Sequence, residues 1–321
     1  MKTYFLVDFD STIMYKSDSF FDDISNMLLG EFAETFLNPP KDAEVKEYSD
    51  FFIFQTNHKI LKKDAIRLYF DFKKSDVGVK LFELIKQQDN FFLDELIGEI
   101  ENFLSSKDNL DEDVKFWYME QVLSFFRALY TVIYHKRDIV DSFLRFYRLA
   151  YIKNNKILIN TLQSQKDIGW IVEVMSKIDP IKYSFLQHIQ LYGGSMISSK
   201  RDSNRVAYIL YNEKVLNDVN TKVVVVGDSL MDAKNYSELT KYKNPNDFIL
   251  SFPQKTELLI DREKCEKFFE DAVAYLPMEK IDRIKRSYQL QIDYEDSGRE
   301  TESKYGLFGG HFDTIIEKGL I

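Results

Sequence analysis

Three short apolar segments in this chain each end in polar residues, as buried strands do where they enter loops. They span residues 3–7, 156–160 and 222–226, and the residues that follow them are Asp8, Thr161 and Gly227. The third segment contains four consecutive valines before its glycine. Such a run favours a strand buried on both faces of a parallel sheet over a short helix.

Helical patterns follow the second and third apolar segments, over Lys166 to Lys177 and over Leu230 to Leu239. Strands and helices therefore alternate from about residue 151 to residue 250. This alternation predicts an α/β fold with a doubly wound, Rossmann-like parallel sheet as its core.

The roughly 135 residues between the first two strands differ from this core, because their apolar residues recur at helical spacing. We predict a large all-helical insertion over residues 17–151, a core of residues 1–16 and 152–255, and a C-terminal helical and irregular extension over residues 256–321. The insertion is rich in aromatic residues. We interpret them as a packed helical core; a stacking platform for bases or sugars is the alternative.

Composition and charge narrow the class of protein. Of the 321 residues, 45% are hydrophobic and 30% are charged, which is ordinary for a soluble protein with a sizeable core. The net charge of -9 argues against a nucleic-acid duplex or an anionic membrane as the principal partner. The sequence gives no indication of oligomeric state.

The single cysteine, Cys265, cannot form an intramolecular disulfide, and no Cys/His cluster of zinc type is present in the sequence. The apolar run that ends at Val7 is too short for the core of a signal peptide, and no stretch reaches the length of a membrane span. We therefore expect a cytoplasmic protein.

Two acidic pairs stand where predicted strands end. Asp8 and Asp10 leave the same face of an extended backbone, and two carboxyl groups in one pocket have pKa values that are pushed apart. Asp228 and Asp232 lie four residues apart around the first turn of a predicted helix, where capping alone could explain either residue. For Asp8 and Asp10 the alternative is an ordinary turn-capping role.

Capping does not explain why two of three predicted parallel strands end in an acidic pair. The carboxyl ends of the strands of a doubly wound sheet converge on one crevice. Three or four carboxylates gathered there suggest a hard cation with oxygen ligands, most simply Mg²⁺.

The complete pattern resembles the haloacid dehalogenase superfamily of hydrolases. It comprises a strand into Asp8-Phe9-Asp10-Ser11-Thr12, a strand ending in Thr161, a lysine at Lys200, and a valine strand into Gly227-Asp228-Ser229 with Asp232. The insertion directly after the first motif is similar to the helical cap of that superfamily's phosphatase branch.

The resemblance implies a role for each matched residue. Asp8 would attack phosphorus and form an aspartyl phosphate, while Asp10 would serve as general acid and then general base. Thr161 and Lys200 would bind the phosphoryl group, with Ser164, Arg201 and Arg205 as alternatives. Magnesium would be held by Asp8, Asp228 and the backbone carbonyl of Asp10, with Asp232 as a further ligand or a partner of the ligands.

Asp10 favours phosphoryl transfer over carbon–halogen cleavage, because dehalogenases of this superfamily lack an aspartate at that position. A helical cap implies a small phosphorylated metabolite as substrate. The leading hypothesis is thus a magnesium-dependent phosphatase. The alternatives are a phosphotransferase or phosphomutase with the same nucleophile, and a binding or scaffold protein built on a hydrolase-like core.

Overall fold

The computed structural model describes residues 1–16, 98, 101–102, 105–106, 112, 128, 137–178, 180–194, 198–252, 260–297 and 312. Most of the insertion predicted for residues 17–151, with most of its aromatic residues, lies outside this part of the chain. So does the tail after residue 297, apart from Phe312.

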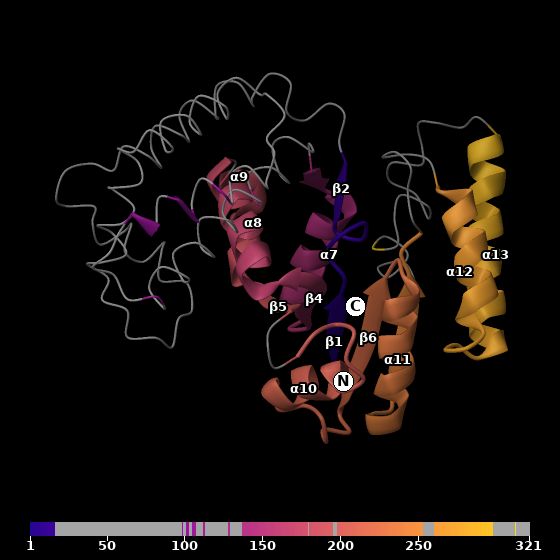
Figure 1. Ribbon diagram of the computed structural model, residues 1–321. Helices are drawn as coiled ribbons and strands as arrows, with labels where there is room; N and C mark the ends of the chain where they lie inside the picture. The colour runs from indigo at the N-terminus through magenta and orange to yellow at the C-terminus, as the bar shows by residue number, and fades with distance from the viewer. Residues whose placement is uncertain are drawn as a thin grey trace. The chain divides into compact units, whose positions relative to one another are not determined.

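The larger of the two sheets in the described part of the chain has five strands, all parallel (Figure 1). Its strand order is β5-β4-β1-β6-β7. The strands are β1 (Lys2–Val7), β4 (Lys156–Ser164), β5 (Gln190–Gly194), β6 (Thr221–Gly227) and β7 (Asn246–Leu250). The chain extends the sheet on one side of β1 and then crosses to the other side, so the predicted doubly wound α/β fold is confirmed.

The three predicted strands are present as β1, β4 and β6, whereas β5 and β7 were not predicted. Each of these two strands has only five residues, and β5 ends in Gly193 and Gly194. β4 also continues past the predicted end at Thr161, as far as Ser164, through an irregularity in its pairing with β5 after Asn160.

The chain divides into two compact units. The first contains residues 1–17, 137–165 and 188–321, and the second contains residues 18–136 and 166–187. Within the second unit lie nearly all of α8 (Gln165–Ile178) and all of α9 (Pro180–Tyr183). In the same unit, the 3-10 helix η2 (Ser184–His188) begins beside Tyr183, whose carbonyl accepts a hydrogen bond from Ser176.

Two short antiparallel strands mark where the chain leaves the first unit and returns to it. They are β2 (Met14–Lys16) and β3 (Arg137–Ile139), with Met14 opposite Ile139. After β3 comes α7 (Asp141–Ile152), which the sequence placed in the insertion. It lies instead in the first unit, because the Phe146 ring packs edge-on against Phe5 of β1, with their centroids 4.9 Å apart.

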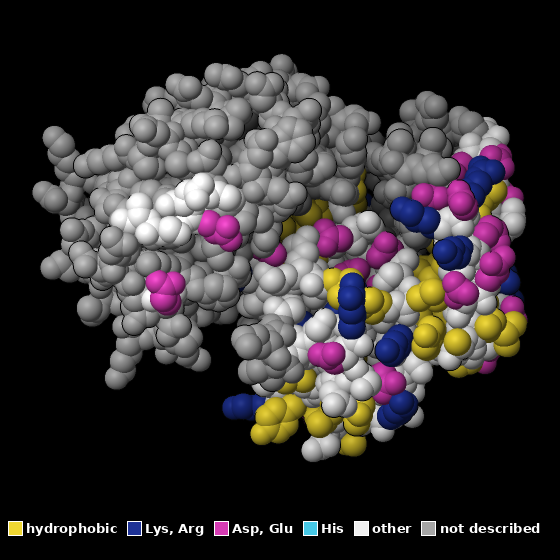
Figure 2. All heavy atoms as spheres, viewed as in Figure 1, with side chains coloured by type: hydrophobic (Ala, Val, Ile, Leu, Met, Phe, Trp, Pro, Cys, Tyr) yellow, Lys and Arg dark blue, Asp and Glu magenta, His cyan; other side chains and the backbone are white. Residues whose placement is uncertain are grey.

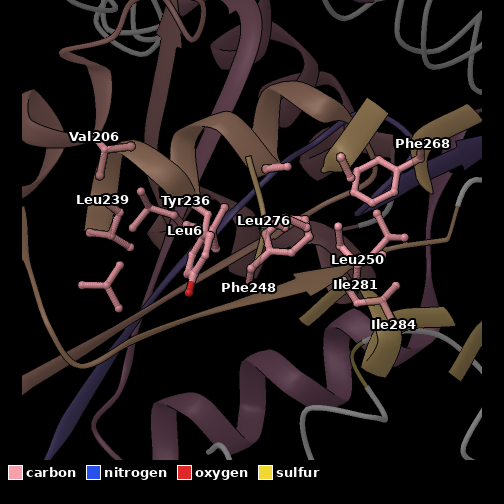
Figure 3. Packing of buried hydrophobic residues seen from close by; sticks show 14 of the residues in the cluster. Leu6, Val206, Tyr236, Leu239, Phe248, Leu250, Phe268, Leu276, Ile281 and Ile284 are labelled. Atoms are coloured by element: carbon pink, nitrogen blue, oxygen red, sulfur yellow. The ribbon is translucent and has the colours of Figure 1, made fainter. Parts of the chain in front are cut away.

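The opposite face of the sheet carries a continuous apolar cluster (Figure 3). It combines alternate residues of the strands, such as Leu6 and Phe248, with α10 (Arg205–Asn212) and α11 (Leu230–Tyr242). Two helices of the predicted C-terminal extension, α12 (Arg262–Ala272) and α13 (Met278–Asp296), contribute to the same cluster. They are therefore packed onto the core domain.

Charged side chains of both signs are interspersed over α12 and α13 on the face shown in Figure 2. Among the described residues, no helix is both long enough and apolar enough to cross a membrane.

Candidate active site

The loop after β1 places Asp8 at the carboxyl end of the central strand. The Asp8 backbone N–H donates to the Val226 carbonyl of β6 (2.8 Å), which continues the sheet pairing by one residue. The Phe9 N–H donates to Asp8 Oδ1 (2.8 Å). The chain then turns sharply through Ser11, whose φ of 58° is uncommon for a residue other than glycine. Asp8 is thus held in place by backbone on both sides.

Lys200 lies between two carboxylates at this edge of the sheet. Its Nζ is 2.8 Å from Asp8 Oδ1 and 2.7 Å from Asp232 Oδ1. The side chain is only 2% exposed, so its ammonium group is largely removed from water. Burial alone would lower the pKa of Lys200, but Asp232 and Asp8 outweigh this effect and hold the pKa above its usual value. Lys200 therefore stays charged.

Asp232 also organises the start of α11. Its Oδ2 accepts hydrogen bonds from the Ser229 hydroxyl (2.6 Å) and the Ser229 backbone N–H (3.2 Å). Gly227 makes this arrangement possible, because a Cβ atom built there would lie 2.1 Å from Asp232 Cγ. Capping and pairing with Lys200 are thus combined in one side chain.

Negative charge exceeds positive charge in this cluster. Asp8, Asp228 and Asp232 each offer a carboxylate oxygen, and these atoms lie within 4.8 Å of one another. Burial raises the pKa of Asp8 well above its usual value, and the charges of Asp232 and Asp228 add to this effect while Lys200 opposes it. Burial, followed by the charge of Asp232, raises the pKa of Asp228 to about 6. One lysine does not balance three carboxylates.

This donor set fits a hard divalent cation such as Mg²⁺, which takes carboxylate oxygens and would relieve the excess negative charge. Asp232 already uses both oxygens, for Lys200 and for Ser229. On Asp8, Lys200 and the Phe9 N–H both engage Oδ1 and leave Oδ2 to other groups. Asp8 and Asp228 are therefore the better candidates for direct ligands, and Asp232 fits a supporting role.

Asp10 is not part of the carboxylate cluster. Both of its oxygens accept from the Gln163 side-chain amide, at 2.9 Å for Oδ1 and 2.8 Å for Oδ2. Thr161 is fully buried, and its hydroxyl oxygen accepts from the Gln163 backbone N–H (3.2 Å). A hydroxyl that accepts one hydrogen bond still has its own proton to donate. Nothing in the sequence had singled out Gln163.

The structure distinguishes among the three cations at positions 200, 201 and 205. Arg201 is exposed, and only Lys200 pairs with Asp8. The Arg205 side chain is buried and donates to the Asn160 side chain (2.9 Å) and to the backbone carbonyls of Tyr192, Gly193 and Ser198. It thereby links β4 and β5 to the loop that carries Lys200.

No protein-family model and no curated protein matches the sequence at a significant level. Among solved structures, the chain is similar to a phosphonoacetaldehyde hydrolase-like protein from Oleispira antarctica, with 10% identity, a TM-score of 0.34, and 89% of this chain and 84% of that chain covered.

The chain is also similar to two further solved structures, whose names were assigned provisionally. One is a phosphoglycolate phosphatase from Lactobacillus delbrueckii subsp. bulgaricus, with 14% identity, a TM-score of 0.32 and coverage of 78% and 84%. The other is a haloacid dehalogenase-like hydrolase from Bacteroides fragilis, with 13% identity, a TM-score of 0.30 and coverage of 78% and 98%.

Proposed function

We propose that this protein is a magnesium-dependent phosphatase that hydrolyses a small phosphate monoester through an aspartyl phosphate on Asp8. The observation that carries the proposal is the buried carboxylate of Asp8, held by Lys200 and surrounded by Asp228 and Asp232 at the carboxyl ends of β1 and β6. A lone capping aspartate needs neither the buried lysine nor the other two acids.

In the first step, Asp8 attacks phosphorus through its carboxylate as the bond from phosphorus to the leaving oxygen breaks. Asp10 gives its proton to that leaving oxygen. Lys200 is placed to offset negative charge on Asp8 and on the phosphoryl oxygens, while the Thr161 hydroxyl donates to one of these oxygens. A bound magnesium ion would supply additional compensation for the same negative charge.

In the second step, a water oxygen bonds to phosphorus and the bond from phosphorus to the Asp8 oxygen breaks. Asp10 now takes a proton from the attacking water, which returns Asp10 to its starting protonation state. The products are inorganic phosphate and the free alcohol.

The direct test follows phosphate release from an aryl phosphate and from a panel of phosphorylated metabolites, in Mg²⁺ and in chelator. Asp8→Asn should lose at least about a thousandfold in activity, and acid-quenched wild type should carry a covalent phosphate that the variant lacks. The matched control is Asp282→Asn, the same substitution at an exposed position of α13, which should retain full activity.

Undiminished turnover by Asp8→Asn would rule out the proposed nucleophile. An added alcohol acceptor separates hydrolysis from transfer, because a phosphotransferase would give a phosphorylated acceptor where a phosphatase gives free phosphate. If the wild type released phosphate from no substrate and showed no detectable Mg²⁺ binding, the scaffold hypothesis would be favoured.

A further inference from the structure

The Gln163 side chain contacts the Asp10 carboxylate directly. It stands on β4, two residues beyond Thr161, in the stretch where the register between β4 and β5 shifts. Its amide nitrogen donates to both Asp10 oxygens, at 2.9 and 2.8 Å, across 153 positions of the chain. Two hydrogen bonds to one carboxylate restrict both its position and its rotation.

Stability alone does not explain this orientation of Gln163. Its amide oxygen is buried and finds no hydrogen-bond partner in the described part of the chain. A buried amide oxygen without a partner is unfavourable. Turning the amide over would place that oxygen against the Asp10 carboxylate, so an ionised Asp10 favours the orientation in which Nε2 faces it.

Gln163 also links Asp10 to the predicted phosphoryl-binding residue. Its backbone N–H donates to the Thr161 hydroxyl oxygen (3.2 Å), while its side chain contacts Asp10. Asp10 itself lies on a short loop after β1, beside Ser11 with its positive φ. A strand residue that reaches from β4 to this loop fixes the distance between the two functional groups.

We propose that Gln163 is a positioning residue that orients the Asp10 carboxyl group toward the leaving oxygen of the substrate. This inference rests on the proposed phosphatase function. In the step concerned, the proton on Asp10 moves to the leaving oxygen as the phosphorus–oxygen bond breaks and the Asp8–phosphorus bond forms. Gln163 exchanges no proton and touches no substrate atom in this step.

The role predicts a dependence on the leaving group that a purely structural residue would not produce. A nitrophenolate leaves readily without a proton, whereas a more basic phenolate needs one. Loss of Gln163 should therefore reduce kcat/KM by about tenfold or more for phenyl phosphate, and by clearly less for 4-nitrophenyl phosphate. The plot of log kcat/KM against leaving-group pKa should become steeper.

The experiment measures this plot over substituted phenyl phosphates for wild type, Gln163→Ala, Asp10→Asn and the double variant, all in Mg²⁺. Asp10→Asn should show the steeper slope, and adding Gln163→Ala to it should have little further effect. The matched control is Gln289→Ala, which removes a similar contact from glutamine to aspartate on α13, where Gln289 Nε2 lies 2.8 Å from Asp293 Oδ1. It should follow the wild-type line.

An equal loss for all leaving groups would overturn the positioning role, and so would an unchanged slope with full activity. Additive effects of Asp10→Asn and Gln163→Ala would overturn it too, because the two residues would then act independently. Asp8→Asn is assayed in parallel. If that variant keeps its activity, the proposed function fails and the inference with it; if it is inactive, the slope decides the inference alone.

Discussion

Two lysine–aspartate contacts in the first unit have opposite electrostatic character. At the carboxyl end of the sheet, Lys200 is shared between Asp8 and Asp232, and the acids outnumber the lysine. At the edge of the sheet, Asp247 of β7 is shared between Lys280, at 2.5 Å, and Arg283, at 3.9 Å, both on α13. There the cations outnumber the acid.

The pKa values follow this difference. Burial and neighbouring acids raise the pKa of Asp8 and of Asp228. Burial alone would also raise the pKa of Asp247, but the hydrogen bond and charge of Lys280 outweigh it and leave the pKa below its usual value. The carboxylate at the sheet edge thus stabilises the fold, whereas ionisation of those in the site lowers its stability, a pattern that is common at functional sites.

The largest expected effect comes from removing the shared lysine. Lys200→Met leaves two buried carboxylates without their cation, so the free energy of unfolding in chelator should fall by about 3 to 5 kcal/mol. Denaturant unfolding at pH 7 measures this change, and Mg²⁺ should restore part of it. Lys241→Met is the control, because its exposed pair with Glu238 should contribute about 0.5 kcal/mol or less. Equal losses in the free energy of unfolding for Lys200→Met and Lys241→Met would show that the buried lysine contributes no more than the exposed one.

Asp228→Asn should stabilise the metal-free protein. The folded pKa of about 6 lies above that of an unfolded aspartate, about 3.9, so ionising Asp228 destabilises the fold as pH rises between these values. Above that range the variant should exceed wild type by about 1 to 3 kcal/mol in chelator, with no difference below pH about 4. Urea unfolding from pH 4 to pH 8 checks this. A variant less stable than wild type at pH 8 in chelator would show that Asp228 is not under electrostatic stress.

Gly227→Ala should disturb the site through Asp232. The added Cβ would meet the Asp232 side chain at 2.1 Å, so that side chain must leave its contacts with Lys200 and Ser229. We expect a loss of about 1 to 3 kcal/mol in stability together with weaker Mg²⁺ binding, measured by thermal unfolding with and without Mg²⁺. Gly169→Ala in α8, where a Cβ has open space, should not destabilise the protein. A Gly227 variant with wild-type metal response would argue against the supporting role of Asp232.

Asp247→Asn should have the smallest effect, with the opposite sign of pH dependence. A folded pKa below the unfolded one adds stability above pH about 4, and this contribution is lost as pH falls through the folded pKa. The variant should be less stable at pH 7 and should converge with wild type under acid conditions. Urea titrations at several pH values measure both changes. If the difference in stability between wild type and variant grew as pH fell, the lowered pKa assigned to Asp247 would be wrong.

Local sequence patterns were sufficient for the strands that form the centre of the sheet. β1, β4 and β6 are predictable because each is an apolar run ended by polar residues, and their carboxyl ends bring Asp8, Asp228 and Asp232 together. β5 and β7 were not predicted, because these edge strands have only five residues each, and so short a segment carries too little apolar pattern to be recognised. The predicted end of β4 at Thr161 was early, since the irregular pairing that extends it depends on β5.

The sequence by itself determined the α/β class and the acidic motifs, because period, strand ends and charge are local properties of the chain. Only the tertiary structure decided which of three neighbouring cations meets Asp8, since burial and direction separate Lys200 from Arg201 and Arg205. It also brought Gln163 to Asp10 across 153 positions. Such contacts depend on how strands pair and loops turn in space, and no local pattern of residues records them.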